Sequence, residues 1–113
     1  MDITHRPWGW YENLYSSDKA YKVKRLYVSP NQRISLQYHN NRSEHWVVVA
    51  GNGTVTLEDD CIAVSVGNYI FIPLESTHRV QSGDDGIMII EVQQGSSCEE
   101  EDIVRLDDDY NRV

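Results

Sequence analysis

Residues 33–51, RISLQYHNNRSEHWVVVAG, contain two runs with the alternating pattern of β-strands and a polar segment between them. Successive side chains of a strand point to opposite faces, so Gln37 and His39 share one face of the first run. In the second run Glu44 lies on one face and His45 on the other. If the two strands are neighbours through the NNRS turn, Gln37, His39 and Glu44 converge.

Short runs of this kind recur along the chain of 113 residues. Turn-forming sequences rich in Gly, Asn, Asp, Ser and Pro separate them, among them SPNQ, GNG, VGN and SGDDG. The predicted strands are residues 21–28, 33–38, 44–50, 54–58, 62–66, 69–72, 78–81 and 87–93. Helical periodicity is nearly absent, and many short strands at regular spacing are typical of an all-β sandwich or barrel.

Composition excludes several classes of protein. The chain is 40% hydrophobic and 25% charged, as globular domains are. Its formal net charge of −8 argues against non-specific nucleic-acid binding, which needs a basic face. No apolar run is long enough to cross a bilayer, and the first fifteen residues contain no apolar targeting region. We therefore expect no nucleic acid and no membrane as partners, and a cytoplasmic location.

The two cysteines and the basic residues add less specific information. Cys61 and Cys98 lie in no CxxC pair or zinc-finger spacing, so both are expected to remain reduced. Six of the ten Lys and Arg residues fall between positions 19 and 42. A local basic segment in an acidic protein can bind a small anion, although charge alone favours solvated strand and tail faces.

A further histidine is available downstream of the first two runs. GNYIFIPLESTH, residues 67–78, is an apolar strand that stops at a proline, and His78 begins the next predicted strand. The resulting donor set of two imidazoles, a carboxylate and an amide oxygen suits a borderline divalent ion such as zinc, manganese, iron or nickel. The candidate ligands are Gln37, His39, Glu44 and His78. Ordinary structural roles for these polar residues remain the alternative.

The spacing of these residues resembles the two cupin motifs. The first motif corresponds here to Asn31 in place of a glycine, then Gln37, His39, Glu44 and Gly51. The second corresponds to Gly67, Pro73, Glu75 in place of a glycine, His78 and Ser82 in place of an asparagine. Asparagine tolerates a positive φ angle well and glutamate tolerates it less well, so the turn at Glu75 departs further from the motif.

Longer segments resemble the C-terminal domain of bacterial mannose-1-phosphate guanylyltransferase/mannose-6-phosphate isomerase enzymes. They are RPWGWYENL, YKVKRLYVSP, SLQYHNNRSEHWVVVAGNGTV, YIFIPLESTHRV and IIEVQQGSSCEEEDIVRLDDDY, in the same order and over nearly the whole chain. The resemblance implies an all-β, single-domain cupin, a double-stranded β-helix or jelly-roll barrel, over residues 1–113. Within it we expect an N-terminal arm at 1–15, a barrel core at 20–94 and an acidic C-terminal segment at 99–113.

The same resemblance implies a type II mannose-6-phosphate isomerase. Such an enzyme is a metal-dependent aldose–ketose isomerase that acts on mannose 6-phosphate or a related phosphosugar through an enediol intermediate. One divalent ion, which is zinc, manganese, cobalt, nickel or iron, is implied on the four candidate ligands. No nucleotidyltransferase domain is matched, so guanylyltransferase activity is not expected of this chain alone. The alternatives are a non-catalytic or regulatory metal-binding cupin and a cupin enzyme with another small-molecule substrate.

Isomerisation of a phosphosugar needs a base for the C2 proton and a cation for the phosphate. We predict that Arg42 is catalytic, because the resemblance associates its RSEHW segment with isomerase activity. Glu91 is a second candidate for a catalytic residue, as an inward carboxylate on the last core strand. Lys24 and Arg79 are predicted to bind the phosphate. Because small cupins commonly pair, we also expect a homodimer.

Overall fold

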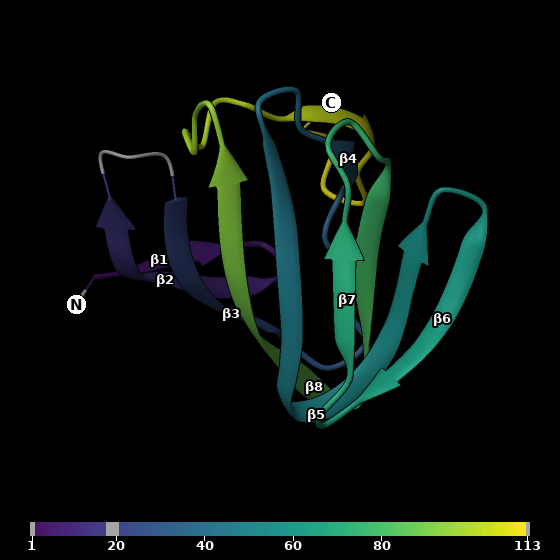
Figure 1. The fold of residues 1–113 in the computed structure, drawn as a ribbon. Coiled ribbons are helices and arrows are strands. Elements are labelled where there is room, and N and C mark those ends of the chain that lie inside the picture. Colours follow the sequence, from purple (N-terminus) through teal and green to yellow (C-terminus); the bar gives the residue numbers. More distant parts are fainter. Residues whose placement is uncertain (1, 18–20, 113) are drawn as a thin grey trace.

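The structure is a computed structural model that describes residues 2–17 and 21–112 (Figure 1). In these ranges every named element of secondary structure is a β-strand. The described residues contain no helix long and apolar enough to cross a membrane. The strands are β1 (Ile3–Arg6), β2 (Gly9–Ser17), β3 (Tyr21–Val28), β4 (Leu36–Tyr38), β5 (Arg42–Leu57), β6 (Asp60–Ser65), β7 (Tyr69–Ile72), β8 (His78–Gly95) and β9 (Val104–Asp107).

The strands form one curled antiparallel sheet. Its order is β1-β2-β3-β8-β4-β9, and β5 pairs with β6, β7 and β8. The two longest strands, β5 and β8, pair from Arg42 opposite Gly95 to Leu57 opposite His78 and hold the two halves of the curl together (Figure 1). The predicted all-β class is therefore confirmed, and the curl is that of a small jelly-roll barrel.

Two sequences that predict turns lie inside these long strands. Residues 51–53 belong to β5 and residues 82–86 to β8, and the β5–β8 pairing shifts register between Gly51 and Gly53. Gly51 and Gly86 have φ angles of 74° and 76°, and a Cβ atom on Gly51 would lie 2.0 Å from the carbonyl oxygen of Gly86. Only glycine combines this φ with such a close approach, so the two strands bend here without ending.

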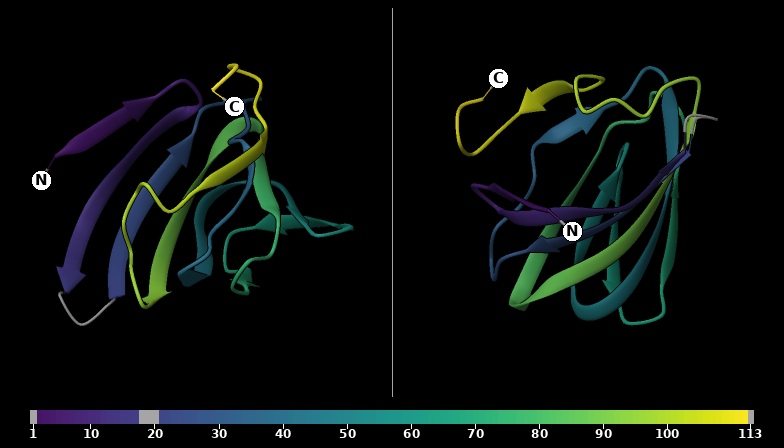
Figure 2. Two further views of the ribbon diagram at one scale, coloured as in Figure 1. Left: turned by 90° about the horizontal axis from the view of Figure 1, so that it is seen from above. Right: turned by 90° about the vertical axis from the view of Figure 1, so that its left-hand side faces the viewer.

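Both ends of the chain lie against the barrel. The segment predicted as an N-terminal arm forms β1 and β2, which pair with each other and extend the sheet beyond β3. At the other end of the chain, β9 pairs with β4, and the C-terminal segment lies across one end of the curled sheet (Figure 2). Residues from both termini consequently reach the same end of the barrel.

Strand alternation fills the inside of the curl with two kinds of side chain. The apolar core comprises Trp8, Tyr11, Leu26, Val28, Ile34, Trp46, Val48, Val55, Val64, Ile72, Val80, Ile87 and Ile89. Polar side chains are also buried, among them Lys24, His39, Arg42, Glu44, His78 and Glu91. Because buried polar groups are costly unless they are paired, a cluster of them marks a candidate functional site.

Candidate metal centre and its pocket

Three of the predicted ligands come together inside the barrel. His39 follows β4, Glu44 lies in β5 and His78 begins β8. All three are buried, and their potential ligand atoms lie within 4.8 Å of one another. His39 Nε2 is 3.2 Å from Glu44 Oε2, and His78 Nε2 is 3.7 Å from Glu44 Oε1. The Glu44 carboxylate thus lies between the two imidazoles.

Backbone carbonyls determine which ring nitrogen of each histidine faces the centre. His39 Nδ1 lies 2.7 Å from the carbonyl oxygen of Asp102, and His78 Nδ1 lies 2.9 Å from that of Ser76. A carbonyl oxygen only accepts, so each Nδ1 carries the hydrogen. Burial lowers the pKa of both imidazoles, that of His39 to about 4, so both rings are neutral at pH 7 and their Nε2 atoms present lone pairs.

This arrangement fits a divalent metal ion. The lone pair of His39 Nε2 and an oxygen of Glu44 lie 3.2 Å apart as two acceptors, and the Arg42 guanidinium donates to both of them, so the two atoms are arranged to share a cation. Neutral imidazoles oriented by carbonyl groups, together with a carboxylate, are typical ligands of zinc and related ions. The described residues therefore contain a His–Glu–His cluster whose chemistry suits a metal.

Gln37, the fourth predicted ligand, lies beside this cluster. It pairs with His78 across the β4–β8 ladder, and it lines the same pocket as Glu44 and His78. Its amide nitrogen donates to the hydroxyl and carbonyl oxygens of Ser35, at 2.9 and 3.2 Å. The side chain is therefore held next to the centre, and its role as a ligand stays a prediction.

His39 and Glu44 meet although their strands, β4 and β5, do not form the hairpin on which the sequence-based expectation depends. Within the described strands, β4 pairs with β8 and β9 and not with β5. The turn between β4 and β5 is held instead by the Asp102 carboxylate, which accepts hydrogen bonds of 2.8 Å from the backbone N–H groups of Asn40 and Asn41. Asp102 thus positions the turn with its side chain and His39 with its carbonyl group.

Arg42 is buried against the candidate metal centre. Its Nε donates to Glu44 Oε2 at 2.9 Å, and one terminal nitrogen lies 3.4 Å from His39 Nε2, to which it donates. Its other terminal nitrogen donates to the carbonyl oxygen of Glu99 at 2.9 Å. The predicted catalytic cation therefore contacts two candidate metal ligands directly.

Glu91 is a buried carboxyl group next to the centre. Trp46 donates to one oxygen at 2.9 Å and Gln93 to the other at 2.8 Å, while Lys24 Nζ lies 3.9 Å from the second oxygen. Burial, and then the negative charge of Glu44, raise the pKa of Glu91 to about 7. A carboxyl group with such a pKa can take up and release a proton near neutral pH.

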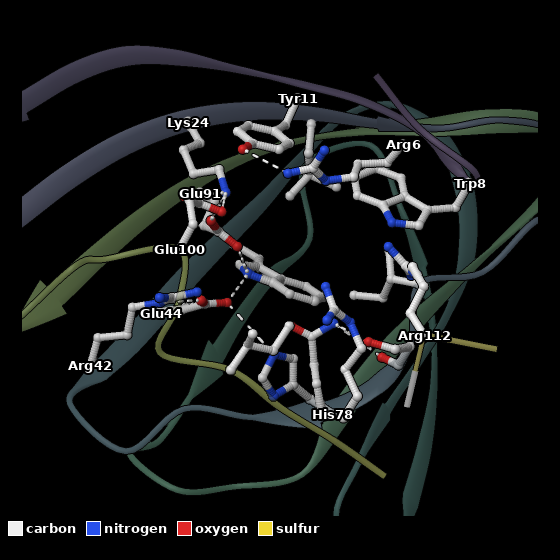
Figure 3. Close-up of a pocket in the computed structure, with 17 residues that line it drawn as sticks. Arg6, Trp8, Tyr11, Lys24, Arg42, Glu44, His78, Glu91, Glu100 and Arg112 are labelled. Atoms are coloured by element: carbon white, nitrogen blue, oxygen red, sulfur yellow. Dashed lines mark hydrogen bonds and ion pairs between the residues drawn. The ribbon is translucent and has the colours of Figure 1, made fainter. Parts of the chain in front are cut away.

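These groups surround a pocket with an empty volume of about 680 Å³, including its opening. Figure 3 shows Lys24, Glu44 and Glu91 on one side of it. Six of the eight predicted site residues line the pocket, namely Lys24, Gln37, Arg42, Glu44, His78 and Glu91. His39 does not line the pocket, but it contacts Glu44, which does.

Arg79, the remaining predicted residue, is not brought to this pocket. It follows His78 in β8 and so points to the other face of the strand. Its Nε donates to the carbonyl oxygen of Ile34 at 3.0 Å, and a terminal nitrogen donates to Asp107 at 3.1 Å. This placement gives no support to a phosphate-binding role and instead shows Arg79 linking β8 to the C-terminal segment.

Several pocket residues escaped prediction from the sequence. They are Arg6, Trp8, Tyr11, Glu100, Arg105 and Arg112, which come from the two ends of the chain. The sequences of their segments resemble the family. Neither strand alternation nor charge, however, predicts that the first residues of the chain lie close to the last.

Comparison with known proteins places the chain in a family. Residues 2–108 match the sequence profile described as mannose-6-phosphate isomerase C-terminal. The chain belongs to this family. Its relatives include the mannose-1-phosphate guanylyltransferase of Escherichia coli strain K12, which is 44% identical over 96% of this chain, and the alginate biosynthesis protein AlgA of Pseudomonas aeruginosa, which is 41% identical over 96%.

The chain spans only 23% of the length of either relative. Solved structures confirm the cupin fold. The oxalate decarboxylase OxdC of Bacillus subtilis superimposes with a TM-score of 0.83 at 17% identity, over 93% of this chain and 30% of that one. The cupin domain of Schizosaccharomyces pombe Cnp3 gives 0.78 at 7% identity, over 89% and 73%.

Proposed function

We propose that this chain is a metal-dependent isomerase that interconverts mannose 6-phosphate, or a related phosphosugar, and the corresponding ketose. One observation carries the proposal: in a chain of this family, two members of a His–Glu–His cluster, Glu44 and His78, line the same pocket as the buried carboxyl group of Glu91. The ion of the proposal is zinc, manganese, cobalt, nickel or iron, which imidazole and carboxylate ligands accommodate.

The chain supplies groups for each requirement of the reaction. A divalent ion bound by His39, Glu44 and His78 would polarise the carbonyl group of the sugar. Glu91 is the proposed base that removes the C2 proton and returns it at C1, which a single carboxyl group can do from one face of the substrate. Arg42 is proposed to stabilise negative charge on the substrate oxygens, and it orients Glu44 through their hydrogen bond.

The proposal also includes a cytoplasmic location and a homodimer. Both cysteines are free in the structure, which accords with a reducing compartment. Size-exclusion chromatography with light scattering measures the oligomeric state.

A coupled assay tests the proposed activity. Formation of fructose 6-phosphate from mannose 6-phosphate is followed in the purified protein, after chelation, and after addition of each candidate ion. We expect activity to disappear on chelation and to return with at least one ion. His39→Ala should abolish it, whereas His45→Ala, which alters the outer face of β5 at a residue bonded to Tyr69 and Gln94, should retain it.

Absence of turnover with every candidate ion would refute the isomerase proposal. If the protein then still binds one equivalent of metal through His39, the non-catalytic metal-binding cupin becomes the better account.

A further inference from the structure

Three arginines that are not part of the candidate metal centre also line the pocket. Arg6 ends β1, Arg105 lies in β9 and Arg112 follows β9 near the C-terminus. Figure 3 shows Arg6 and Arg112 on the side of the pocket opposite Arg42 and Glu44. Burial lowers the pKa of Arg105, and the positive charges of Arg112 and Arg6 lower it further, as expected for guanidinium groups that lie close together. The two termini thus form a positively charged end of the pocket.

The charge at this end is incompletely neutralised. Arg112 is paired with Asp108, at 2.7 and 3.1 Å. Among the described residues, the terminal nitrogens of Arg6 contact only uncharged oxygens, the carbonyl of His5 at 3.3 Å and the hydroxyl of Tyr11 at 3.4 Å. The Nε atom of Arg105 is buried and has no hydrogen-bond partner among residues 2–17 and 21–112. A buried guanidinium donor without an acceptor is rare, because it loses its hydration without compensation.

The cations at the metal end of the same pocket are paired. Lys24 Nζ lies 3.2 Å from Glu100 and 3.9 Å from Glu91, and Arg42 is bonded to Glu44. Carboxylates therefore already offset much of the charge of these two side chains, which leaves less of it to balance a phosphate dianion. Arg6 and Arg105 have no carboxylate partner within the described part of the chain, which leaves donors available to a ligand.

We propose that Arg6, Arg105 and Arg112 form an anion-binding site for the phosphate monoester of the ligand that occupies this pocket. Planar guanidinium groups match the oxygens of a phosphate through paired hydrogen bonds, and a dianion compensates the two unpaired positive charges. The sugar part of the ligand rests on the proposed function, whereas the phosphate site rests on the arginines alone. Lys24, predicted from the sequence to bind phosphate, is paired with Glu91 and Glu100, and its role toward the phosphate stays a prediction.

Calorimetric titration with inorganic phosphate and with mannose 6-phosphate tests this site without requiring turnover. We expect Arg105→Met to weaken binding of both ligands at least about tenfold, the loss typical of one charge-assisted hydrogen bond. Arg6→Met should give a loss in the same direction, and because Arg6 is exposed its replacement leaves the fold intact. The matched control is Arg33→Met, which removes an arginine that is outside the pocket and paired with Asp109.

A direct readout accompanies the titration. The Nε–H resonance of Arg105 should shift when phosphate is added to protein labelled with nitrogen-15, and it should not shift with unphosphorylated mannose. Phosphate binding that is equal in the wild type, Arg105→Met and Arg6→Met would overturn the site, even if the isomerase were active. Arginine-dependent phosphate binding without turnover would support the site and refute only the isomerase.

Discussion

Glu91 has a position in the pocket that strand alternation alone explains. It lies in β8 on the same face as Gln93, and both side chains are buried. Both carboxyl oxygens accept a hydrogen bond, from Trp46 and from Gln93, so the group is held in one orientation toward the pocket. A fixed carboxyl group is what a proton transfer between neighbouring carbon atoms requires.

Replacing Glu91 with glutamine tests this role. Glu91→Gln keeps the shape of the side chain but removes the base, so we expect kcat to fall by about 10²–10⁴-fold. Metal content and the circular dichroism spectrum should remain those of the wild type. Glu58→Gln, at an exposed turn residue bonded to Thr77, is the control and should retain full activity. A turnover number for Glu91→Gln within threefold of the control would rule Glu91 out as the base.

Glu75 occupies a backbone conformation that favours glycine. Its φ is 64°, and it is the third residue of a turn closed by the hydrogen bond from Ser76 N–H to the Pro73 carbonyl. A positive φ at this position is typical of a type II turn. The same turn carries the Ser76 carbonyl that orients His78, so the strained residue lies next to the metal centre.

Glu75→Gly should stabilise the protein. The left-handed conformation costs an L-residue about 1–2 kcal/mol, and the extra freedom of glycine in the unfolded chain returns roughly half of that, so we expect about 0.5–1 kcal/mol more stability. Denaturant unfolding measures this change. Glu75→Ala removes the same side chain but keeps the strain, so an equal gain in both variants would contradict the backbone explanation.

The segment that precedes β9 acts as a support for the metal centre. Residues 99–102 supply the carbonyl groups that hold Arg42 and His39, and the Asp102 carboxylate holds the turn at 40–41. None of these contacts is local, since His39 and Asp102 are 63 residues apart. The centre therefore depends on the docking of a C-terminal element as well as on the barrel strands.

Removing this support should weaken metal binding. Asp102→Ala frees the turn beside His39, and loss of such outer contacts typically lowers metal affinity about 10–100-fold. Competition with a chromophoric chelator measures the affinity. Glu101→Ala changes the exposed neighbouring residue and serves as the control. Equal affinities in the two variants would show that the segment does not position His39.

Strands were the elements most accessible from the sequence. The predicted runs at 21–28 and 69–72 coincide with β3 and β7. The runs at 44–50 and 54–58 instead join into β5, and those at 78–81 and 87–93 join into β8. Glycine-containing sequences predict turns between strands. In the structure the glycines instead allow β5 and β8 to bend without ending, where the carbonyl group of Gly86 approaches Gly51.

At the scale of the whole molecule, the metal centre joins β5, β8 and the residue that follows β4. An ion bound there would link segments that are far apart in the chain and would bind the folded state alone. Ligand binding of this kind stabilises the fold by mass action, by about 2.7 kcal/mol at a ligand concentration 100 times Kd.

We therefore expect a large change in thermal stability with metal. Saturation of the metal-free protein with a binding ion should raise Tm by roughly 10 °C or more, given the usual relation between stability and Tm for a domain of this size. Differential scanning calorimetry measures the shift. In His39→Ala the shift should vanish, whereas it should persist in His45→Ala. An equal shift in His39→Ala would place the bound ion elsewhere.

The sequence by itself determined the side-chain chemistry and the faces of the strands. Alternation in β5 predicts that Glu44 points inward and His45 outward, and the structure has Glu44 buried and His45 bonded to Tyr69 and Gln94 outside. Such a pattern is a local property, because it follows from the backbone geometry of a single strand.

Only the tertiary structure decided which groups meet. It separated β4 from β5, turned Arg79 away from the pocket and brought Arg6, Arg105 and Arg112 into its lining. These contacts depend on the closing of the curled sheet and on the docking of both termini. Alternation determines the face to which a side chain points. It does not determine which distant segment lies opposite that face, because this depends on the packing of the whole chain.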